Sequence, residues 1–271
     1  MFELKPTDNP HRWSLLVERN LCTGAAERQF LFGGIGMAAS IDAMEQTCQR
    51  PVIWATAQYL SFAHPGRTVD LDVQIPVAGR MTTQANVLLH IGDQKIITVQ
   101  AALGAREDRA GDQWVTMPEV LPPEDCRPAN YWRGDGTGLN ARLEIRVAEG
   151  AFHGDPLIKG RGDGRLIFWL RSREGFLADA RLLAIAADYV ASAIASATGL
   201  HAGGNSLDNT IRYGRITPCE WILCDVQLDM LVDGLVHGRM NLFSPDGVLM
   251  AAASQSMIMR VHSRLKRPAT D

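Results

Sequence analysis

The stretch LLAIAADYVASAIASAT, residues 182–198, decides the fold, and its only charged residue is Asp188. Apolar and small residues surround it at helical spacing, which predicts a buried helix over about 179–198 that ends at Gly199. A carboxylate in such a helix must be paired, hydrogen-bonded or protonated, because an isolated buried charge is very costly. Asp188 is therefore either a functional group or a cap for a neighbouring segment, and the helix alone does not decide between these two interpretations.

The order of predicted elements repeats along the chain, with strand structure, one long helix and then four strands in each half. The first-half helix is expected over 32–48, which opens with a double glycine. Alternating apolar and polar residues predict first-half strands at 68–78, 81–91 and 95–104. The second-half strands are expected at 165–171, 206–214, 220–230, 234–243 and 248–260.

Four prolines lie in the segment between the two halves. A connection of this length is unusual inside one compact unit and normal between two units. We therefore predict an N-terminal unit over 1–106, an inter-unit linker over 107–139 and a C-terminal unit over 140–271.

One helix followed by four antiparallel strands is the hot-dog arrangement, in which a curled sheet wraps the helix. A single unit of this kind leaves an open sheet edge, and pairing two units joins their sheets and removes that edge. The predicted fold class is therefore α+β: a tandem (double) hot-dog with two long helices wrapped by one continuous antiparallel sheet.

The composition is that of an ordinary globular protein, with 271 residues and a net charge of -3. The charge is too small to indicate binding to nucleic acid, and no apolar run reaches the ~20 residues of a membrane span. The N-terminus lacks the apolar core of a signal peptide. The five cysteines are widely spread without a CxxC pair, which is typical of reduced thiols. We expect a cytoplasmic protein without a metal or cofactor.

Five short motifs stand in a fixed order along the chain. They are Phe32-Gly33-Gly34 at the first helix start, Phe168-Trp169-Leu170-Arg171, Ala186-Ala187-Asp188-Tyr189, Ser206-Leu207-Asp208-Asn209, and Gln255 followed by Arg260. This ordered set resembles the acyl-CoA thioesterase II group of double hot-dog thioesterases over roughly residues 12–260. The chain departs from the usual residues of that group at Ile35, Asn209 and Ser256, where Gln, His and Glu are common.

The resemblance implies an acyl-CoA thioesterase of lipid metabolism that acts on a small-molecule acyl-CoA and assembles as a homo-oligomer of double hot-dog units. In that family an Asp on the second helix, a Ser or Thr on the following strand and a Gln on the last strand hold the attacking water. Carried over, these residues are Asp188, Ser206 and Gln255. The departures at Asn209 and Ser256 fall outside this set, so we expect them to affect substrate choice more than reaction type.

Thioester hydrolysis can proceed by two broad routes. A serine or cysteine nucleophile requires a histidine base and an acidic partner, but the histidines lie mostly in predicted loops and no GxSxG motif occurs. Alternatively, a carboxylate accepts the proton of a water that a hydroxyl and an amide hold in position. Asp188, Ser206 and Gln255 supply one group of each kind, and we expect Ser206 to hold the water rather than to attack.

The oxyanion of the reaction needs hydrogen-bond donors, and Gly33 and Gly34 offer bare N–H groups at a helix start. In the alternative interpretation these glycines only permit close packing.

Two other functions remain open at this stage. One is a non-catalytic acyl-CoA-binding hot-dog protein, and the other is a hot-dog hydratase that would use His64 in the HPG turn. Release of free thiol from acyl-CoA distinguishes hydrolysis from binding without turnover.

Overall fold

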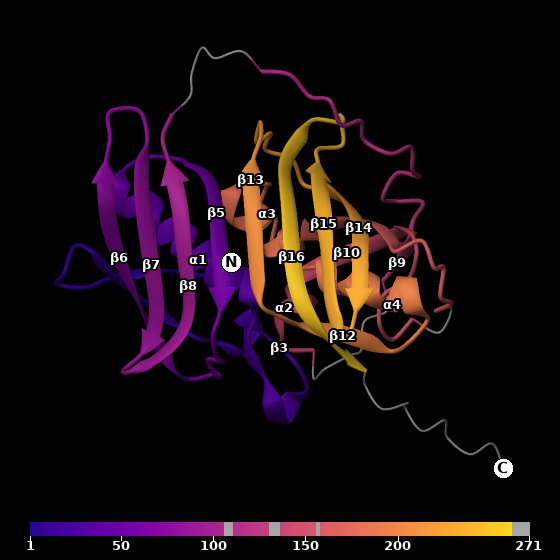
Figure 1. Ribbon diagram of the computed structural model, residues 1–271, viewed down its shortest axis with the longest axis horizontal. Coiled ribbons are helices and arrows are strands. Elements are labelled where there is room, and N and C mark those ends of the chain that lie inside the picture. The colour runs from indigo at the N-terminus through magenta and orange to yellow at the C-terminus, as the bar shows by residue number, and fades with distance from the viewer. Residues whose placement is uncertain (106–110, 130–135, 156–157, 262–271) are drawn as a thin grey trace.

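The computed structural model describes residues 1–105, 111–129, 136–155 and 158–261. Figure 1 shows one curved sheet across the molecule, with the first half of the chain at one end and the second half at the other. Helices α1 (Gly33–Cys48) and α3 (Ala180–Ala187) pack against each other on one face of this sheet. Every strand pair described is antiparallel. The predicted double hot-dog fold is confirmed.

The first half supplies α1 and one side of the sheet. Its strands are β1 (Lys5–Pro6), β2 (Arg12–Leu16), β3 (Cys22–Thr23), β4 (Phe30–Leu31), β5 (Val52–Tyr59), β6 (Thr68–Ala78), β7 (Thr83–Ile91) and β8 (Gln94–Leu103), with short 3₁₀ helices η1 (Arg19–Leu21) and η2 (Ala26–Arg28). Strand β5, the fourth strand that the repeat requires, was not predicted from the sequence.

The second half has the same plan. Its elements are β9 (Arg127–Pro128), α2 (Leu139–Arg142), β10 (Leu143–Glu149), β11 (Arg165–Ser172), α3, η3 (Val190–Ser192), α4 (Ala193–Thr198), β12 (Ala202–Ser206), β13 (Asp208–Tyr213), β14 (Ile222–Val232), β15 (Leu235–Phe243) and β16 (Leu249–Val261). The unit boundaries predicted above stay a prediction.

Two predicted elements are each divided in the structure. The helix expected over 179–198 is interrupted at Asp188, where α3 gives way to η3 and then to α4. The strand expected over 206–214 corresponds to β13 and to the last residue of β12, and Leu207 separates these two strands. Both interruptions lie beside the candidate site described below. Gly199 ends α4 with a φ of 70°, as predicted.

The two halves join where β5 pairs with β13. Thr56 lies opposite Thr210 at this join, and their hydroxyl oxygens are 2.8 Å apart. The strand order through the described residues is β1-β2-β6-β7-β8-β5-β13-β16-β15-β14-β11-β10-β9, with β12 on β16. The join therefore turns two small sheets into one, which leaves neither unit with an open edge at that position.

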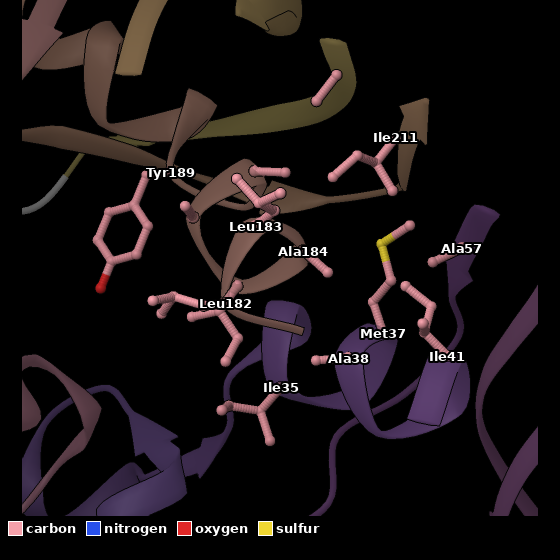
Figure 2. Close-up of a cluster of buried hydrophobic side chains, with 14 of the residues drawn as sticks. Ile35, Met37, Ala38, Ile41, Ala57, Leu182, Leu183, Ala184, Tyr189 and Ile211 are labelled. Atoms are coloured by element: carbon pink, nitrogen blue, oxygen red, sulfur yellow. The ribbon is translucent and has the colours of Figure 1, made fainter. Parts of the chain in front are cut away.

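The core lies between the helices and the concave side of the sheet. Figure 2 shows Leu182, Leu183 and Ala184 of α3 beside α1, which contributes Met37 and other apolar side chains. Every residue from 182 to 190 is buried, as the absence of a polar face predicts. Residues Ala180–Thr198 are long and apolar enough to cross a membrane, but 72% of an 18-residue window within them is buried inside the fold. These residues form a core helix segment of the double hot-dog.

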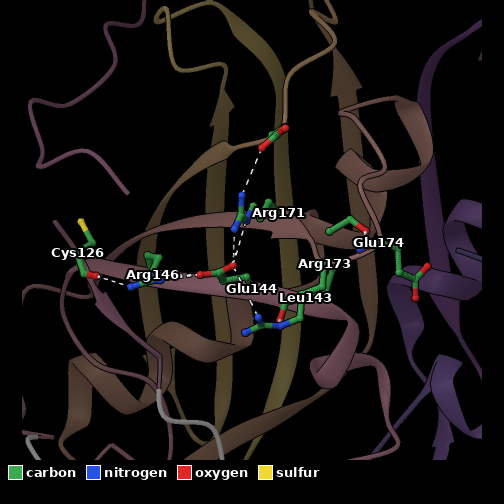
Figure 3. Close-up of polar contacts among 9 residues, drawn as sticks. Cys126, Leu143, Glu144, Arg146, Arg171, Arg173 and Glu174 are labelled. Atoms are coloured by element: carbon green, nitrogen blue, oxygen red, sulfur yellow. Dashed lines mark hydrogen bonds and ion pairs between the residues drawn. The ribbon is translucent and has the colours of Figure 1, made fainter. Parts of the chain in front are cut away.

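The outer face of the second half is partly covered by the segment that precedes β9. Trp169 Nε1 donates to the Leu121 carbonyl at 2.9 Å. Figure 3 shows Glu144 with Arg146 and Arg171 around its carboxylate. Burial alone would raise the pKa of Glu144, but the hydrogen bonds from these arginines outweigh it and lower the pKa. This outer cluster lies on the linker side of the fold.

Candidate active site

Asp188 lies at the C-terminal end of α3, where it joins the two halves of the molecule. Its φ of -82° and ψ of 4° take the chain out of the α-helix. Its side chain reaches α1, where Oδ2 accepts the N–H of Gly34 at 2.7 Å. The residue before α1 is Phe32, which has no polar side-chain atom to cap that helix. Asp188 therefore caps α1 from the other half of the chain.

Gln255 and Ser206 complete a hydrogen-bonded set with Asp188. Gln255 Nε2 on β16 donates to Asp188 Oδ1 at 2.5 Å and to Ser206 Oγ at 2.8 Å. Ser206 ends β12, which pairs with β16, so both strands deliver their side chains to the same place. The structure thus brings together the three residues that the sequence analysis selected, although they are up to 67 residues apart.

The environment of Asp188 raises its pKa to about 7. Burial is the largest cause, because a charged carboxylate loses its hydration there. Hydrogen bonds from Gly34 and Gln255 oppose the rise because they stabilise the ionised form, and the nearby Asn209 amide acts in the same direction. A pKa near neutrality suits a general base, which must be ionised and still bind a proton well.

Gly33 and Gly34 lie in direct contact with the second half. A Cβ atom on Gly33 would lie 2.8 Å from Asp188 Oδ2 and 2.8 Å from Tyr59 Cε1. A Cβ atom on Gly34 would lie 2.9 Å from the Cα atom of Ile185. Close packing therefore requires glycine at both positions. The Gly34 N–H donates to Asp188. The Gly33 N–H donates to no acceptor among the hydrogen bonds of the described residues.

A large cavity of about 1260 Å³ adjoins this set. Gly33, Asp188 and Ser206 border it, while aromatic side chains including Phe30 and Phe152 supply much of its apolar wall. Exposed Arg28, Arg173 and Arg260 also border it. Both halves of the chain contribute to this wall, so the cavity exists only because the two units are joined.

Two further residues beside Asp188 were not selected as site residues from the sequence. Tyr59, at the end of β5, borders the cavity. Asn209, on β13, is fully buried and influences the pKa of Asp188. The second-half motif marked Asn209 only as a departure from the family. Of the other departures, Ile35 is in the core, and Ser256 Oγ lies 3.1 Å from Nδ1 of His237.

His64, the residue considered for a hydratase, does not line the cavity. Its Nδ1 lies 2.9 Å from the Gln29 carbonyl oxygen. Among the described residues, no group of three or more His, Cys, Asp or Glu side chains is arranged to hold a metal ion.

Comparisons with known proteins place these features in context. The model of the family described as acyl-CoA thioesterase C-terminal domain matches residues 123–259. The chain is 31% identical to a protein of known structure from Novosphingobium aromaticivorans DSM 12444 that is assigned as a thioesterase. That match covers 93% of this chain and 96% of the other, with a TM-score of 0.84.

More distant structures share the fold. A protein from Thermobifida fusca YX assigned as thioesterase II is 15% identical, with a TM-score of 0.80 and coverage of 95% and 96%. An acyl-CoA thioesterase II, TesB2, from Mycobacterium marinum is 18% identical, with a TM-score of 0.72 and coverage of 96% and 97%. No curated protein sequence matches this chain significantly.

Proposed function

This chain belongs to the acyl-CoA thioesterase family and is a thioester hydrolase, and on that premise we propose that it converts an acyl-CoA to free acid and CoA by direct attack of water. The observation that carries the proposal is the Asp188 carboxylate. It borders the large cavity, has a pKa of about 7 and is hydrogen-bonded to Gln255. A carboxylate of this kind can accept a proton from water at neutral pH.

In the proposed reaction, Asp188 removes a proton from a water that Ser206 helps to hold at the cavity wall. The water oxygen bonds to the thioester carbonyl carbon, and the carbonyl oxygen becomes an oxyanion beside the Gly33 N–H at the positive end of α1. Collapse of this intermediate breaks the carbon–sulfur bond. The departing thiolate then recovers the proton from Asp188, so the enzyme returns to its starting state.

Gln255 serves the reaction by orienting two groups at once. One amide nitrogen donates to both the Asp188 carboxylate and the Ser206 hydroxyl. Because the Ser206 oxygen accepts this bond, its own hydrogen is available to another acceptor. This arrangement favours a water-holding role for Ser206.

The cavity also supports the choice of acyl-CoA as substrate. Its apolar wall suits an acyl chain, and the exposed guanidinium groups of Arg28, Arg173 and Arg260 suit the phosphates of CoA. We propose that the protein acts on cytoplasmic acyl-CoA as a homo-oligomer, which size-exclusion chromatography with light scattering would check.

The test is release of free CoA thiol from a panel of acyl-CoAs, measured for the parent protein and for Asp188→Asn. Hydrolysis by the parent that Asp188→Asn loses supports the proposal. Thermal stabilisation by acyl-CoA without any thiol release would instead favour an acyl-CoA-binding protein. Equal turnover by both proteins would move the base to another residue.

A further inference from the structure

A group of buried polar atoms surrounds the Asp188 carboxylate on the side of the sheet. It comprises Tyr59 Oη, Asn209 Nδ2 and Oδ1, and Gln255 Oε1. None of these atoms is accessible to solvent, and none makes a hydrogen bond of standard geometry within the described part of the chain. They come from β5, β13 and β16, which are neighbours in the sheet. Buried polar atoms in such a state are uncommon and call for an explanation.

Tyr59 and Asn209 both lie close to Asp188. A Cβ on Gly33 would be 2.8 Å from both Asp188 Oδ2 and the Tyr59 ring, so the carboxylate and the ring flank the same glycine. Burial first, and then the charge of Asp188, raise the pKa of Tyr59 well above its usual value. The hydroxyl therefore stays protonated and remains a donor. Asn209 interacts with both Asp188 and Tyr59.

The carboxylate has room for these donors. An ionised carboxylate offers about four acceptor positions. Gly34 and Gln255 each fill one of them. Of the two positions left over, one stays open for the proton of the attacking water. The other can be approached by the Tyr59 hydroxyl and the Asn209 amide after small side-chain rotations.

We propose that Tyr59 and Asn209 are positioning residues that turn their donors toward Asp188 when it ionises, and so hold the carboxylate in its reactive orientation. This inference rests on the proposed function, because it assigns a role relative to the general base. It also assigns Asn209, where the family commonly has His, a role different from the one expected from the sequence. The side chain orients the general base and does not select the substrate.

The other ionisable groups near this cluster have hydrogen-bond partners of their own. Asp208, on β13, raises the pKa of Tyr59, and its Oδ1 accepts the Ser256 N–H at 2.6 Å. Tyr189 directs its hydroxyl to Asn140 Oδ1 at 2.9 Å. Among the described residues, no cationic side chain contributes to the pKa shift of Asp188.

The test is the pH profile of kcat/KM for thioester hydrolysis by Tyr59→Phe and Asn209→Leu. Each change removes one donor from the ionised carboxylate, so the acidic limb should move upward by roughly one pH unit, the usual worth of a hydrogen bond to a charged group. Asn209→His retains a donor and should restore the parent profile.

The matched control is Tyr213→Phe. Tyr213 lies three residues beyond Thr210, as Tyr59 lies three residues beyond Thr56, and its hydroxyl donates to the Ala180 carbonyl at 2.8 Å instead. Removing it should leave the pH profile unchanged. Thermal melting and circular dichroism would verify that each variant is folded, and Tyr59→Phe alone decides the matter if Asn209→Leu does not fold.

The outcomes separate this inference from the proposed function. An acidic limb that stays in place in both Tyr59→Phe and Asn209→Leu, while Asp188→Asn is inactive, overturns the positioning role and leaves the hydrolase mechanism intact. Full activity of Asp188→Asn would overturn the mechanism itself. An equal shift in Tyr213→Phe would show a general effect of losing a buried hydroxyl and would also overturn the inference.

Discussion

The start of α1 and the start of α3 occupy corresponding places in the two units but are capped differently. At α3, Asp179 Oδ1 accepts the Leu182 N–H at 2.8 Å, so that helix is capped by the residue directly before it. At α1, the cap is Asp188 from the other unit. The difference shows how a structural need, satisfying a helix N-terminus, can hold a carboxylate at the wall of a cavity.

The strands beside the two helix starts also carry different side chains at corresponding positions. Thr56 pairs with Gln100 and Thr210 pairs with Ser254, so the residues that follow, Ala101 and Gln255, correspond. Ala55, which precedes Thr56, likewise corresponds to Asn209, which precedes Thr210. The amides that surround Asp188 are thus replaced by alanines in the first unit.

The counterpart of the site is a smaller cavity of about 390 Å³, bordered by Asp42, Glu45 and Arg181 among other residues. Glu45 accepts the Val52 N–H at 2.8 Å, and Arg181 lies 3.9 Å from Asp42. Its charged groups serve hydrogen bonds and ion pairs of the fold. The repeated fold therefore creates two similar sites, and in our proposal the side chains of only one of them carry out hydrolysis.

The largest expected effect comes from Asp188→Asn. Removing the base should lower turnover of a good acyl-CoA by roughly 10²–10⁴-fold, the usual worth of a general base. Asparagine keeps an oxygen that can accept the Gly34 N–H, so α1 stays capped. The matched control is Asp179→Asn, which makes the same change at the other helix start. Comparable losses in both variants would mean that capping, rather than chemistry, explains the effect.

The second prediction concerns stability as a function of pH. The pKa of Asp188 is about 7 in the folded protein and near 3.8 when unfolded, so between these values the folded state binds the extra proton. The stabilisation from this group is complete below pH 3.8 and is lost as pH rises through about 7.

Asp188→Asn has no such group, so its free energy of unfolding relative to the parent should increase from pH 4 to pH 7. The gain should reach up to about 4 kcal/mol and then level off. Urea unfolding of both proteins across this range measures it. A difference that does not vary with pH would show that Asp188 is ionised throughout. The hydrolysis rate of the parent should rise through pH 7, because the ionised Asp188 carboxylate accumulates over the same range.

Much of the fold was accessible from the sequence because its strongest signals are local. The segment 182–198 shows burial directly, since it has no polar face. The break at Asp188 was not predicted, because it depends on a contact with α1 that is 154 residues away. Strand β5 was missed because its core-facing positions include Ala55 and Ala57, which pack against helices but give a weak apolar alternation.

The candidate site was less accessible. Asp188, Ser206 and Gln255 were selected from a resemblance to a family, and the sequence alone holds no information on their mutual distances. Tyr59 had no motif to mark it. Its place at the site follows from the join between β5 and β13, where Tyr59 N donates to the Leu207 carbonyl at 3.0 Å. Register between units is a tertiary property that periodicity does not reveal.

The third prediction makes the site resemble its counterpart. Gln255→Ala introduces the residue that stands at position 101 of the first unit. The loss of one amide frees both the Asp188 carboxylate and the Ser206 hydroxyl, and a misplacement of this kind costs about 10²-fold in rate. Steady-state thiol release measures the loss. Gln100→Ala removes an identical but exposed side chain from β8 and should keep the parent rate. Parent-like activity of Gln255→Ala would remove Gln255 from the mechanism.

The smallest expected effect on rate comes from Ser206→Ala. If Ser206 only holds the water, the neighbouring Asp188 still accepts the proton, and we expect a loss of about tenfold, at the low end for a positioned group. Ser254→Ala changes a serine on the neighbouring strand whose side chain points to the opposite face from Gln255, and it should have the parent rate. A nucleophilic Ser206 predicts a different pattern: its alanine variant would lose at least as much activity as Asp188→Asn. Rapid quenching followed by mass spectrometry adds a direct criterion, because an acyl group covalently attached to Ser206 would contradict direct attack by water. A protein that turns over acyl-CoA without any such adduct, and with the smaller loss in Ser206→Ala, assigns the hydroxyl to the water and the chemistry to Asp188.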